Sequence, residues 1–327
     1  MGEDSSSDLT VGGTIFVRSQ NLEPKLSLKR LFLKFEGGNP TGTQKDRIAR
    51  IIVKRAVKLG CRDIAVGTCG NFGASIAYFS GKMGLKPHIF IPSRYHTRTT
   101  EVIQRDNGVI HKVDGSYEDA VSVCSEVAEA HGWYNASPNT KEVSELSISA
   151  YAKISEEIYS SLGFAPDAVS VPVGNGTTLS GVHQGFKLLL RKGYIDKLPI
   201  LIASSTLGGN PIIKSFKECS HVIKDLKQED IKETEINEPL VSWHAFDGQK
   251  ALDALYETNG YATYASDTKM KEYARLLLWE EGLSVQPASA ASLVALSKYV
   301  REVHSPETYV AILTGRRPYY LKGHTYA

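Results

Sequence analysis

Residues 35–47 read FEGGNPTGTQKDR, and this stretch decides how the rest of the sequence is interpreted. Glycine, asparagine, proline and threonine fill residues 37–43 and predict a turn, and Lys45 then stands where a helix begins. A lysine there lies near the positive end of the helix dipole, which destabilises its ammonium form and favours the free amine. A free amine suits an imine-forming nucleophile. Taken alone, the stretch is more simply interpreted as a turn with an exposed lysine, so the rest of the chain has to decide.

Downstream of this stretch, segments with helical periodicity alternate with short runs rich in β-forming residues. Residues 61–135 predict a βαβαβα unit, in which Ser116 and Asp119 come close to a capping box at the start of a helix. In the second series, helices are expected at 146–162, 268–281 and 288–303, and strands at 168–173 and 309–313. This alternation predicts the α/β class, with largely parallel sheets covered by helices on both faces.

Length and composition limit the functions that the chain can have. With 327 residues and about 150 residues per domain, two domains are expected. The 38 Lys and Arg residues nearly balance the 36 Asp and Glu residues, giving a net charge of +2, so nucleic acid is not the expected partner. Hydrophobic residues make up 42% of the chain, but no run approaches the ~18 consecutive apolar residues of a membrane span, so no membrane association is expected.

The N-terminal residues and the cysteines favour a cytoplasmic protein. The first ten residues, MGEDSSSDLT, are acidic and rich in serine, whereas a signal peptide carries a basic segment and then an apolar one. Cys61, Cys69, Cys124 and Cys219 lie far apart without a Cys-x-x-Cys pair, which suits neither a disulfide scaffold nor a structural zinc site.

Two glycine-rich turns follow strands, where open α/β sheets bind ligands. Residues 67–73, GTCGNFG, place backbone N–H groups and small hydroxyls at the start of a helix, where they can hold an anion such as a carboxylate. Residues 173–181, VGNGTTLSG, lie between another strand and helix, where glycines let the backbone approach a phosphate closely. Purely structural turns are the alternative for both. A nucleotide site is weakly supported, because the turns contain neither G-x-G-x-x-G nor the Gly-Lys-Ser/Thr ending of a phosphate loop.

In this order, the three segments resemble the pyridoxal-phosphate enzymes of the tryptophan-synthase-β fold type (fold type II), and most closely the threonine synthases and their relatives. The family's run around its Schiff-base lysine is Asn-Pro-Thr-Gly-Ser-Phe-Lys-Asp-Arg, and residues 39–47 repeat it with two changes. The family's Ser/Thr-Ser-Gly-Asn-Thr-Gly loop is similar to residues 68–73, and its glycine-rich phosphate cup to residues 171–178. Residues 282–293 and the pair Thr314-Gly315 look like the family's C-terminal motifs, so the resemblance extends over nearly the whole chain.

The resemblance implies a carbon-oxygen lyase that depends on pyridoxal 5′-phosphate, and it gives each matching residue a role. Lys45 is expected to hold the cofactor as a Schiff base and, once substrate displaces it, to move protons at the α carbon. Asn71 is expected to hydrogen-bond the cofactor's 3′ oxygen. Thr314 is expected to face the pyridine nitrogen, where a hydroxyl leaves the ring a weaker electron sink than a carboxylate does. The implied phosphate-binding residues are Gly174, Asn175, Gly176, Thr177 and Thr178. The implied substrate-binding residues are Thr68, Cys69, Gly70, Asn71 and Phe72; no metal is implied.

The resemblance also implies an architecture and a reaction. A larger cofactor-binding domain is expected at 1–47 and 149–327 and a smaller, mobile domain at 48–148, in a homodimer with the cofactor between the domains. The leading hypothesis is a threonine synthase of amino-acid biosynthesis, which converts O-phospho-L-homoserine and water to L-threonine and phosphate. The alternative is a serine/threonine ammonia-lyase, or a β-replacement enzyme acting on serine or an activated serine. A nucleotide-binding protein and a non-catalytic paralogue that keeps the cofactor also remain open.

Departures from the family pattern bear on the substrate. Cys69 and Phe72 replace hydroxyl residues in the loop expected to hold the substrate carboxylate, which removes two donors. Gln286 replaces a glutamate of the family. Residues 135–150 lack the Arg and the Gly-Gln-Lys with which threonine synthases recognise their phosphorylated substrate. Residues 93–100 offer two arginines, a histidine and hydroxyls as a substitute, with a solvated basic loop as the alternative.

The charged segment 224–238 matches no motif of the family. It is poor in large apolar residues, and we interpret it as a surface excursion. Its role, any allosteric effector and the physiological substrate are not determined by the sequence.

Overall fold

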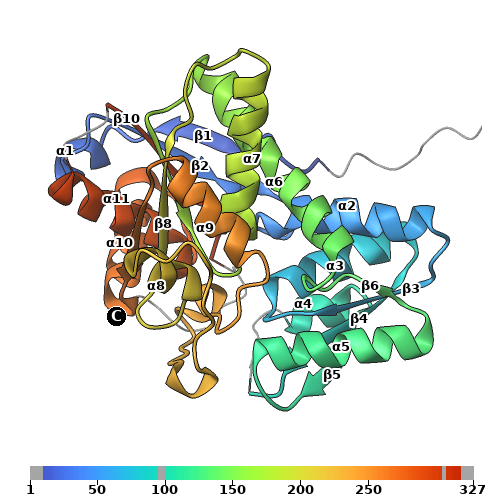
Figure 1. Ribbon diagram of the computed structural model, residues 1–327. Helices are drawn as coiled ribbons and strands as arrows, with labels where there is room; N and C mark the ends of the chain where they lie inside the picture. The colour runs from blue at the N-terminus through green and yellow to red at the C-terminus, as the bar shows by residue number, and fades with distance from the viewer. Residues whose placement is uncertain (1–9, 95–99, 304–306, 318–327) are drawn as a thin grey trace, which may run out of the picture.

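The computed structural model describes residues 10–94, 100–303 and 307–317, which form two sheets of different size. The larger sheet contains, in spatial order, β1 (Ile15–Arg18), β2 (Arg30–Phe35), β10 (Thr308–Leu313), β7 (Ala168–Pro172), β8 (Ile200–Thr206) and β9 (Tyr261–Ala265). The smaller sheet contains β5 (Val109–Val113), β4 (Lys86–Pro92), β3 (Asp63–Gly67) and β6 (Tyr134–Asn135). Among these strands only β1 and β2 pair in an antiparallel manner, so the predicted α/β class with largely parallel sheets is confirmed (Figure 1).

Helices cover both faces of each sheet. On the larger sheet, α11 (Ala291–Glu302) packs on one face, and α7 (Thr177–Arg191) and α9 (Gly248–Glu257) pack on the other. On the smaller sheet, α5 (Tyr117–His131) packs on one face, and α2 (Lys45–Lys58) and α3 (Asn71–Met83) pack on the other. The remaining α-helices are α1 (Leu22–Leu26), α4 (Thr100–Arg105), α6 (Lys141–Leu162), α8 (Pro211–Lys217) and α10 (Asp267–Glu281).

Strand β10 illustrates why these sequences form central strands. All six of its residues are buried, and alternate side chains face different cores. Val310 and Ile312 join the core on the α7 side, whereas Tyr309 and Ala311 join the core under α11. An almost uninterrupted apolar run is what a parallel strand covered on both faces requires.

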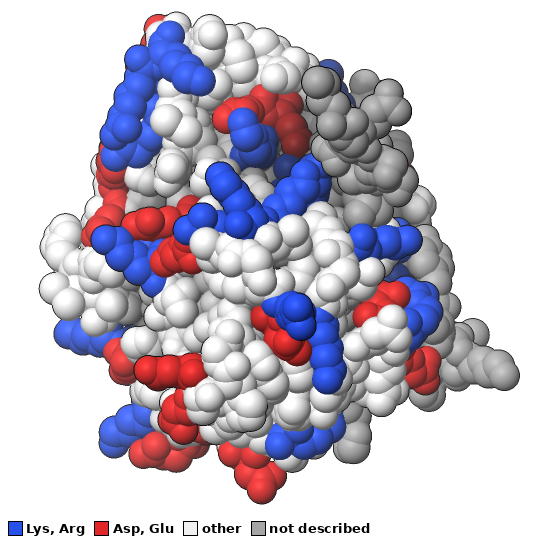
Figure 2. All heavy atoms as spheres, turned by 90° about the vertical axis from the view of Figure 1, so that its right-hand side faces the viewer, with Lys and Arg blue, Asp and Glu red and all other residues white. Residues whose placement is uncertain are grey.

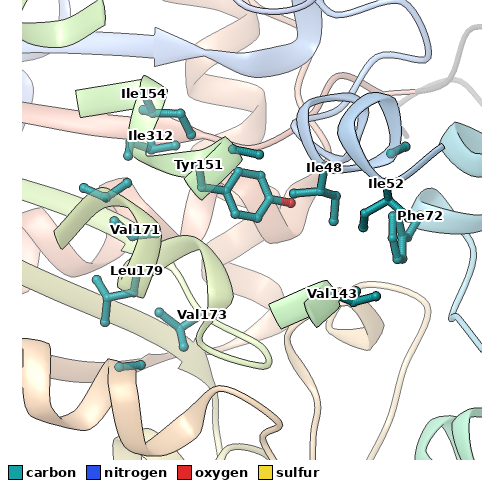
Figure 3. Packing of buried hydrophobic residues seen from close by; sticks show 14 of the residues in the cluster. Ile48, Ile52, Phe72, Val143, Tyr151, Ile154, Val171, Val173, Leu179 and Ile312 are labelled. Carbon is teal, nitrogen blue, oxygen red and sulfur yellow. The ribbon is translucent and has the colours of Figure 1, made fainter. Parts of the chain in front are cut away.

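The two sheets share one hydrophobic core through α2 and α6. Buried residues of β3 and β4 belong to the same cluster as buried residues of β7 and β10. Figure 3 shows part of this cluster, with Tyr151 of α6 between residues of the larger sheet and Ile48 and Ile52 of α2. Tyr151 is fully buried, so burial of its ring contributes to the contact between the two halves of the molecule.

A buried ion network fixes the start of α2. Arg47 donates to Glu36, with Nε 2.6 Å from Oε2, and to Glu157 of α6, with Nη1 2.7 Å from Oε1. Lys34 of β2 lies with Nζ 2.6 Å from Oε2 of Glu157. Burial by itself raises the pKa of Glu157, but its hydrogen bonds to Arg47 and Lys34 lower the value to about 2. A Cβ on Gly12 would stand 2.7 Å from a carboxylate oxygen of Glu157, so this position accepts only glycine without a shift of the network.

The structure refines several of the sequence-based expectations. The capping box at the start of α5 is confirmed, because Ser116 and Asp119 each bond the other's backbone N–H. Helix α6 begins at Lys141 rather than near 146, because Thr140 caps it by accepting from the Val143 N–H. The four strands of the smaller sheet fall within residues 63–135. The division of the chain at 48 and 148, and the mobility of the smaller part, stay predictions.

The outer surface carries both signs of charge. On the face shown in Figure 2, basic and acidic side chains are interspersed over the residues that are not grey, in keeping with the net charge of +2. Within the described ranges, none of the helices has the length and apolar character needed to cross a membrane.

Replacing Arg47 by glutamine should destabilise the protein strongly. The change leaves Lys34, 2.6 Å from Glu157 and 3.9 Å from Glu36, as the one remaining cation of this network beside two carboxylates. We expect a loss of about 3–5 kcal/mol in the free energy of unfolding. Urea denaturation followed by circular dichroism measures it. The control is Arg55→Gln, which breaks the more exposed pair with Glu142, and it should cost less than about 1 kcal/mol. Equal effects of the two substitutions would show that the network contributes no more than a surface ion pair.

Candidate active site

One cavity lies at the carboxyl ends of strands from both sheets. It is lined by residues that follow β3, β6, β7 and β10, and by the first residues of α2. Its empty space amounts to about 1220 Å³, including the part open to solvent. All of the site residues predicted from the sequence line this cavity except Gly70. The structure therefore brings together segments that are more than 200 residues apart in the chain, although the roles of the individual residues stay predictions.

Lys45 is the first residue of α2, and its side chain reaches the cavity. Its Nζ lies 5.8 Å from the centroid of the Phe72 ring. Burial lowers the pKa of the Lys45 amine below its ordinary value, although the charge of Asp247 opposes the shift. The amine is therefore deprotonated more readily than that of an exposed lysine, as a nucleophile or a base requires.

Hydrogen bonds hold the turn before Lys45 in place. The Asp46 carboxylate accepts from the Thr41 backbone N–H at 2.7 Å and from the Thr41 hydroxyl at 2.6 Å. The Gln44 N–H donates to the carbonyl of Thr314 at 2.9 Å, which ties the turn to the end of β10. Gly42 has a φ of +92°, a conformation that other residues rarely adopt.

The turn after β7 is shaped to receive a phosphate. Helix α7 begins there at Thr177 with no side chain capping it, so the N–H groups of its first turn are available to a ligand. Gly176 has a φ of +88°, and a Cβ at this position would stand 2.8 Å from that of Ala251. The Thr178 hydroxyl accepts from Gln44 Nε2 at 2.9 Å, whereas Oε1 of Gln44 is buried without a partner among the described residues.

The turn after β3 presents a second uncapped helix start. Helix α3 begins at Asn71 after Gly70, whose φ of +140° also favours glycine. The Asn71 side chain donates to Gln286 Oε1 at 3.3 Å. Burial raises the pKa of the Cys69 thiol well above its ordinary value, so this side chain is neutral. The second turn therefore offers backbone donors, but Cys69 and Phe72 give it an apolar lining.

Asp247 connects the turn between β7 and α7 with α6. Its carboxylate accepts from the Thr177 hydroxyl at 2.6 Å, from Lys250 Nζ at 3.1 Å and from the Ser144 hydroxyl. The sequence analysis missed Asp247, because an Asp-Gly pair before a helix is typical of an ordinary turn. Ser144 falls within residues 135–150, where the sequence departs from the family pattern, and it lines the cavity.

Two more titratable side chains that the sequence analysis missed line the cavity. Tyr117 accepts from Asn175 Nδ2 at 3.0 Å, and it is only the first residue of α5, so no sequence signal marks it. Glu238 belongs to the charged segment 224–238, and burial raises its pKa to about 8. The interpretation of this segment as a surface excursion is therefore wrong at its C-terminal end. The adjacent apolar residues Pro239 and Leu240 were the signal that could have shown it.

Cationic groups in the cavity are scarce. In the described part of the chain, Lys45 is the only lysine or arginine that lines it. From the basic stretch at 93–100, Arg94 pairs with Glu233 at 2.9 Å, and residues 95–99 lie outside the described residues. Among the described residues, no second cation lines the cavity to bind a phosphorylated substrate. Nothing there replaces the arginine and lysine that threonine synthases have in the stretch corresponding to residues 135–150.

The donor set fits pyridoxal 5′-phosphate. The uncapped start of α7 offers backbone N–H donors where the phosphate ester would sit. Lys45 supplies an amine with a lowered pKa. The Thr314 hydroxyl lies 2.9 Å from the hydroxyl of Ser289, so a neutral group stands at the end of β10, where a carboxylate would favour a protonated ring nitrogen.

Comparisons with known proteins agree with this fit. The family model described as "Pyridoxal-phosphate dependent enzyme" matches residues 8–315. The threonine synthase of Methanocaldococcus jannaschii is 32% identical over 94% of this chain and 75% of its own length. The threonine synthase of Methanosarcina acetivorans is 28% identical over 93% and 74%.

Solved structures show the same fold. An L-serine ammonia-lyase from Rhizomucor miehei superimposes with a TM-score of 0.79 at 22% identity, covering 94% of each chain. Maize serine racemase superimposes with a TM-score of 0.78 at 19% identity, covering 94% of this chain and 91% of its own.

Borohydride reduction should attach the cofactor permanently to Lys45. We expect peptide mapping by mass spectrometry to find the phosphopyridoxyl group on the peptide containing Lys45, and to find none in Lys45→Ala. The matched control is Lys250→Ala, which removes another amine close to the cavity and should leave the labelling unchanged. Labelling of a different lysine in the wild-type protein would contradict the assignment.

Proposed function

The chain belongs to the family of pyridoxal-phosphate-dependent enzymes, as a lyase that uses pyridoxal 5′-phosphate, and from this premise we propose that it catalyses the threonine synthase reaction. In this reaction O-phospho-L-homoserine and water give L-threonine and phosphate. The observation that carries the proposal is the likeness to a relative named threonine synthase, which covers 94% of this chain. A role in threonine biosynthesis, in a cytoplasmic homodimer, belongs to the same proposal.

The chain would hold the cofactor with residues from both sheets. The backbone N–H groups of residues 174–178 would receive the phosphate, and Asn71 would hydrogen-bond the 3′ oxygen. Thr314 would face the ring nitrogen with a neutral hydroxyl. When bound, pyridoxal phosphate withdraws electrons from the α carbon of an amino acid and so makes its proton acidic.

Lys45 would do the proton transfers. As a free amine it would take the proton from the α carbon, after which the bond between the γ carbon and the phosphate oxygen breaks and phosphate leaves. A proton also leaves the β carbon, and the γ carbon gains one and becomes the methyl group. Water then adds its hydroxyl to the β carbon, its other proton goes to the released phosphate, and a proton returns to the α carbon. The lowered pKa of Lys45 supports this role, because a general base works best when its pKa lies near the working pH.

The scarcity of cations favours a second candidate. A phosphorylated substrate would bring a doubly charged group into a cavity that also contains the carboxyl groups of Glu238 and Asp247 and, among the described residues, no second lysine or arginine. Serine or threonine carries no such group. A serine/threonine ammonia-lyase, or an enzyme that replaces the β substituent of serine or an activated serine, would accommodate the same cofactor and base.

An assay of the holoenzyme on separate substrates distinguishes the two candidates. We expect O-phospho-L-homoserine to release phosphate and yield L-threonine in equal amounts, measured by phosphate detection and amino-acid chromatography. Lys45→Ala, reconstituted with cofactor, should lose at least about a thousandfold of this rate, since it removes the base.

The other substrates show how the proposal would fail. Formation of a 2-oxo acid and ammonia from L-serine or L-threonine, without phosphate release from O-phospho-L-homoserine, would contradict the threonine synthase assignment. The protein would then be assigned as an ammonia-lyase. Consumption of O-acetyl-L-serine or O-phospho-L-serine with an added nucleophile would indicate β-replacement.

A further inference from the structure

Residues 233–243 lie beside the cavity and contact both halves of the molecule. Glu233 pairs with Arg94, which follows β4 of the smaller sheet. At the other end, the Trp243 N–H donates to Glu118 of α5 at 3.1 Å, and the Ser242 hydroxyl donates to the same carboxylate at 3.2 Å. Both ends of the segment are therefore anchored on the smaller sheet.

The middle of the segment is anchored on the larger sheet. Asn237 Nδ2 donates to the Thr206 hydroxyl at 3.0 Å, and the Ser205 hydroxyl donates to the carbonyl of Leu240 at 3.0 Å. Both partners belong to β8. The carbonyl of Pro239 would stand 2.8 Å from a Cβ at Gly174, so the backbone of this segment lies directly against the turn after β7. These contacts hold the short helix of Glu238–Leu240 in the wall of the cavity, with Glu238 among the lining residues.

The Glu238 carboxyl lies in an environment that keeps it protonated. Burial is the largest cause of its raised pKa of about 8, and the negative charges of Glu233 and Glu235 add to it. The Cys69 thiol is close enough to donate a weak hydrogen bond to it, which opposes the shift. The other titratable groups that line the cavity are Lys45, Tyr117 and Asp247.

The turn after β3, which lines the same cavity, has fewer side-chain hydrogen-bond donors than the family's loop. Cys69 and Phe72 stand in the turn after β3 where hydroxyl side chains would donate to an anion, and both line the cavity together with Glu238. A protonated carboxyl can donate one strong hydrogen bond to a carboxylate, whereas two ionised carboxylates in contact repel each other.

We propose that Glu238 determines specificity by donating a hydrogen bond from its protonated carboxyl to the α-carboxylate of the substrate. The inference rests on the proposed function in one respect: the substrate is an amino acid whose carboxylate binds at the turn of residues 68–72. Glu238 then replaces the donors that this turn lacks. The pH dependence follows from the sign of the shift. Glu238 is protonated below about pH 8 and donates there, and above that pH it ionises and repels the substrate.

Equilibrium binding to the holoenzyme tests the inference. Dissociation constants of L-threonine and L-serine are measured from the change in the cofactor spectrum, in wild type and in Glu238→Gln. Both proteins donate at about pH 7, so the two constants should be similar. At about pH 9.5 the wild type should bind about thirtyfold more weakly than the variant, because glutamine does not ionise. The ligand's own amine also titrates in this range, but its effect is the same for both proteins. It therefore drops out of the ratio of the two dissociation constants at each pH.

Two controls keep the test specific. Glu235→Gln removes a carboxylate of the same segment that does not line the cavity, and it should retain the weakening at high pH. L-Serinamide has no carboxylate, so its affinity for the wild type should not fall over the same range. This second control needs no variant and stands even where Glu238→Gln does not fold.

The outcomes separate the inference from the proposed function. A ratio of wild type to variant that stays flat from about pH 7 to 9.5 overturns the role of Glu238, and so does equal weakening for L-serinamide. Failure of both amino acids to bind the wild type overturns the proposed function together with the inference. Phosphate release from O-phospho-L-homoserine decides the proposed function independently of Glu238.

Discussion

The position of Lys45 depends on the buried pairing of Arg47 with Glu36 and Glu157. A guanidinium held at 2.6–2.8 Å by two carboxylates in a largely buried site has one favourable geometry, because any displacement weakens both charge-assisted pairs. The three residues come from the end of β2, the start of α2 and the middle of α6. Their pairing therefore sets the point at which α2 begins, and Lys45 is the first residue of that helix. The amine is directed into the cavity by a network that it does not itself join.

The cavity exists because parallel strands end at the same edge of their sheets. The turns after β3, β7 and β10 meet there, and the core shared through α2 and α6 holds the two sheets against each other. Two of these turns lead into helices that no side chain caps, so each presents unsatisfied N–H groups to the same space. One space thus contains two helix N-termini that can each hold an anion, together with the amine of Lys45.

The features that could be predicted from the sequence are local ones. Lys45 and the glycines at 174 and 176 act through their own turn, so a short stretch contains the whole signal. The start of α6 is equally local, because Thr140 is a good N-cap, although the expected helix begins near residue 146 and not at Lys141. Glu238, Asp247 and Tyr117 were not predicted, because each owes its place to contacts far along the chain. Glu238 enters the cavity only because β8 on one side and α5 on the other hold its segment.

The two acidic groups of the cavity have opposite surroundings, and this difference limits which substrates fit. Asp247 accepts hydrogen bonds from Thr177, Ser144 and Lys250. Glu238 has burial and other carboxylates around it, which favour its neutral form. The Asp247 carboxylate adjoins the turn after β7 and restricts how many further anions that turn can hold, whereas a neutral Glu238 can donate to one more. The electrostatics of the described residues therefore suit a ligand pair with one phosphate and one carboxylate. A second phosphate on the substrate would meet no further lysine or arginine among the described residues that line the cavity.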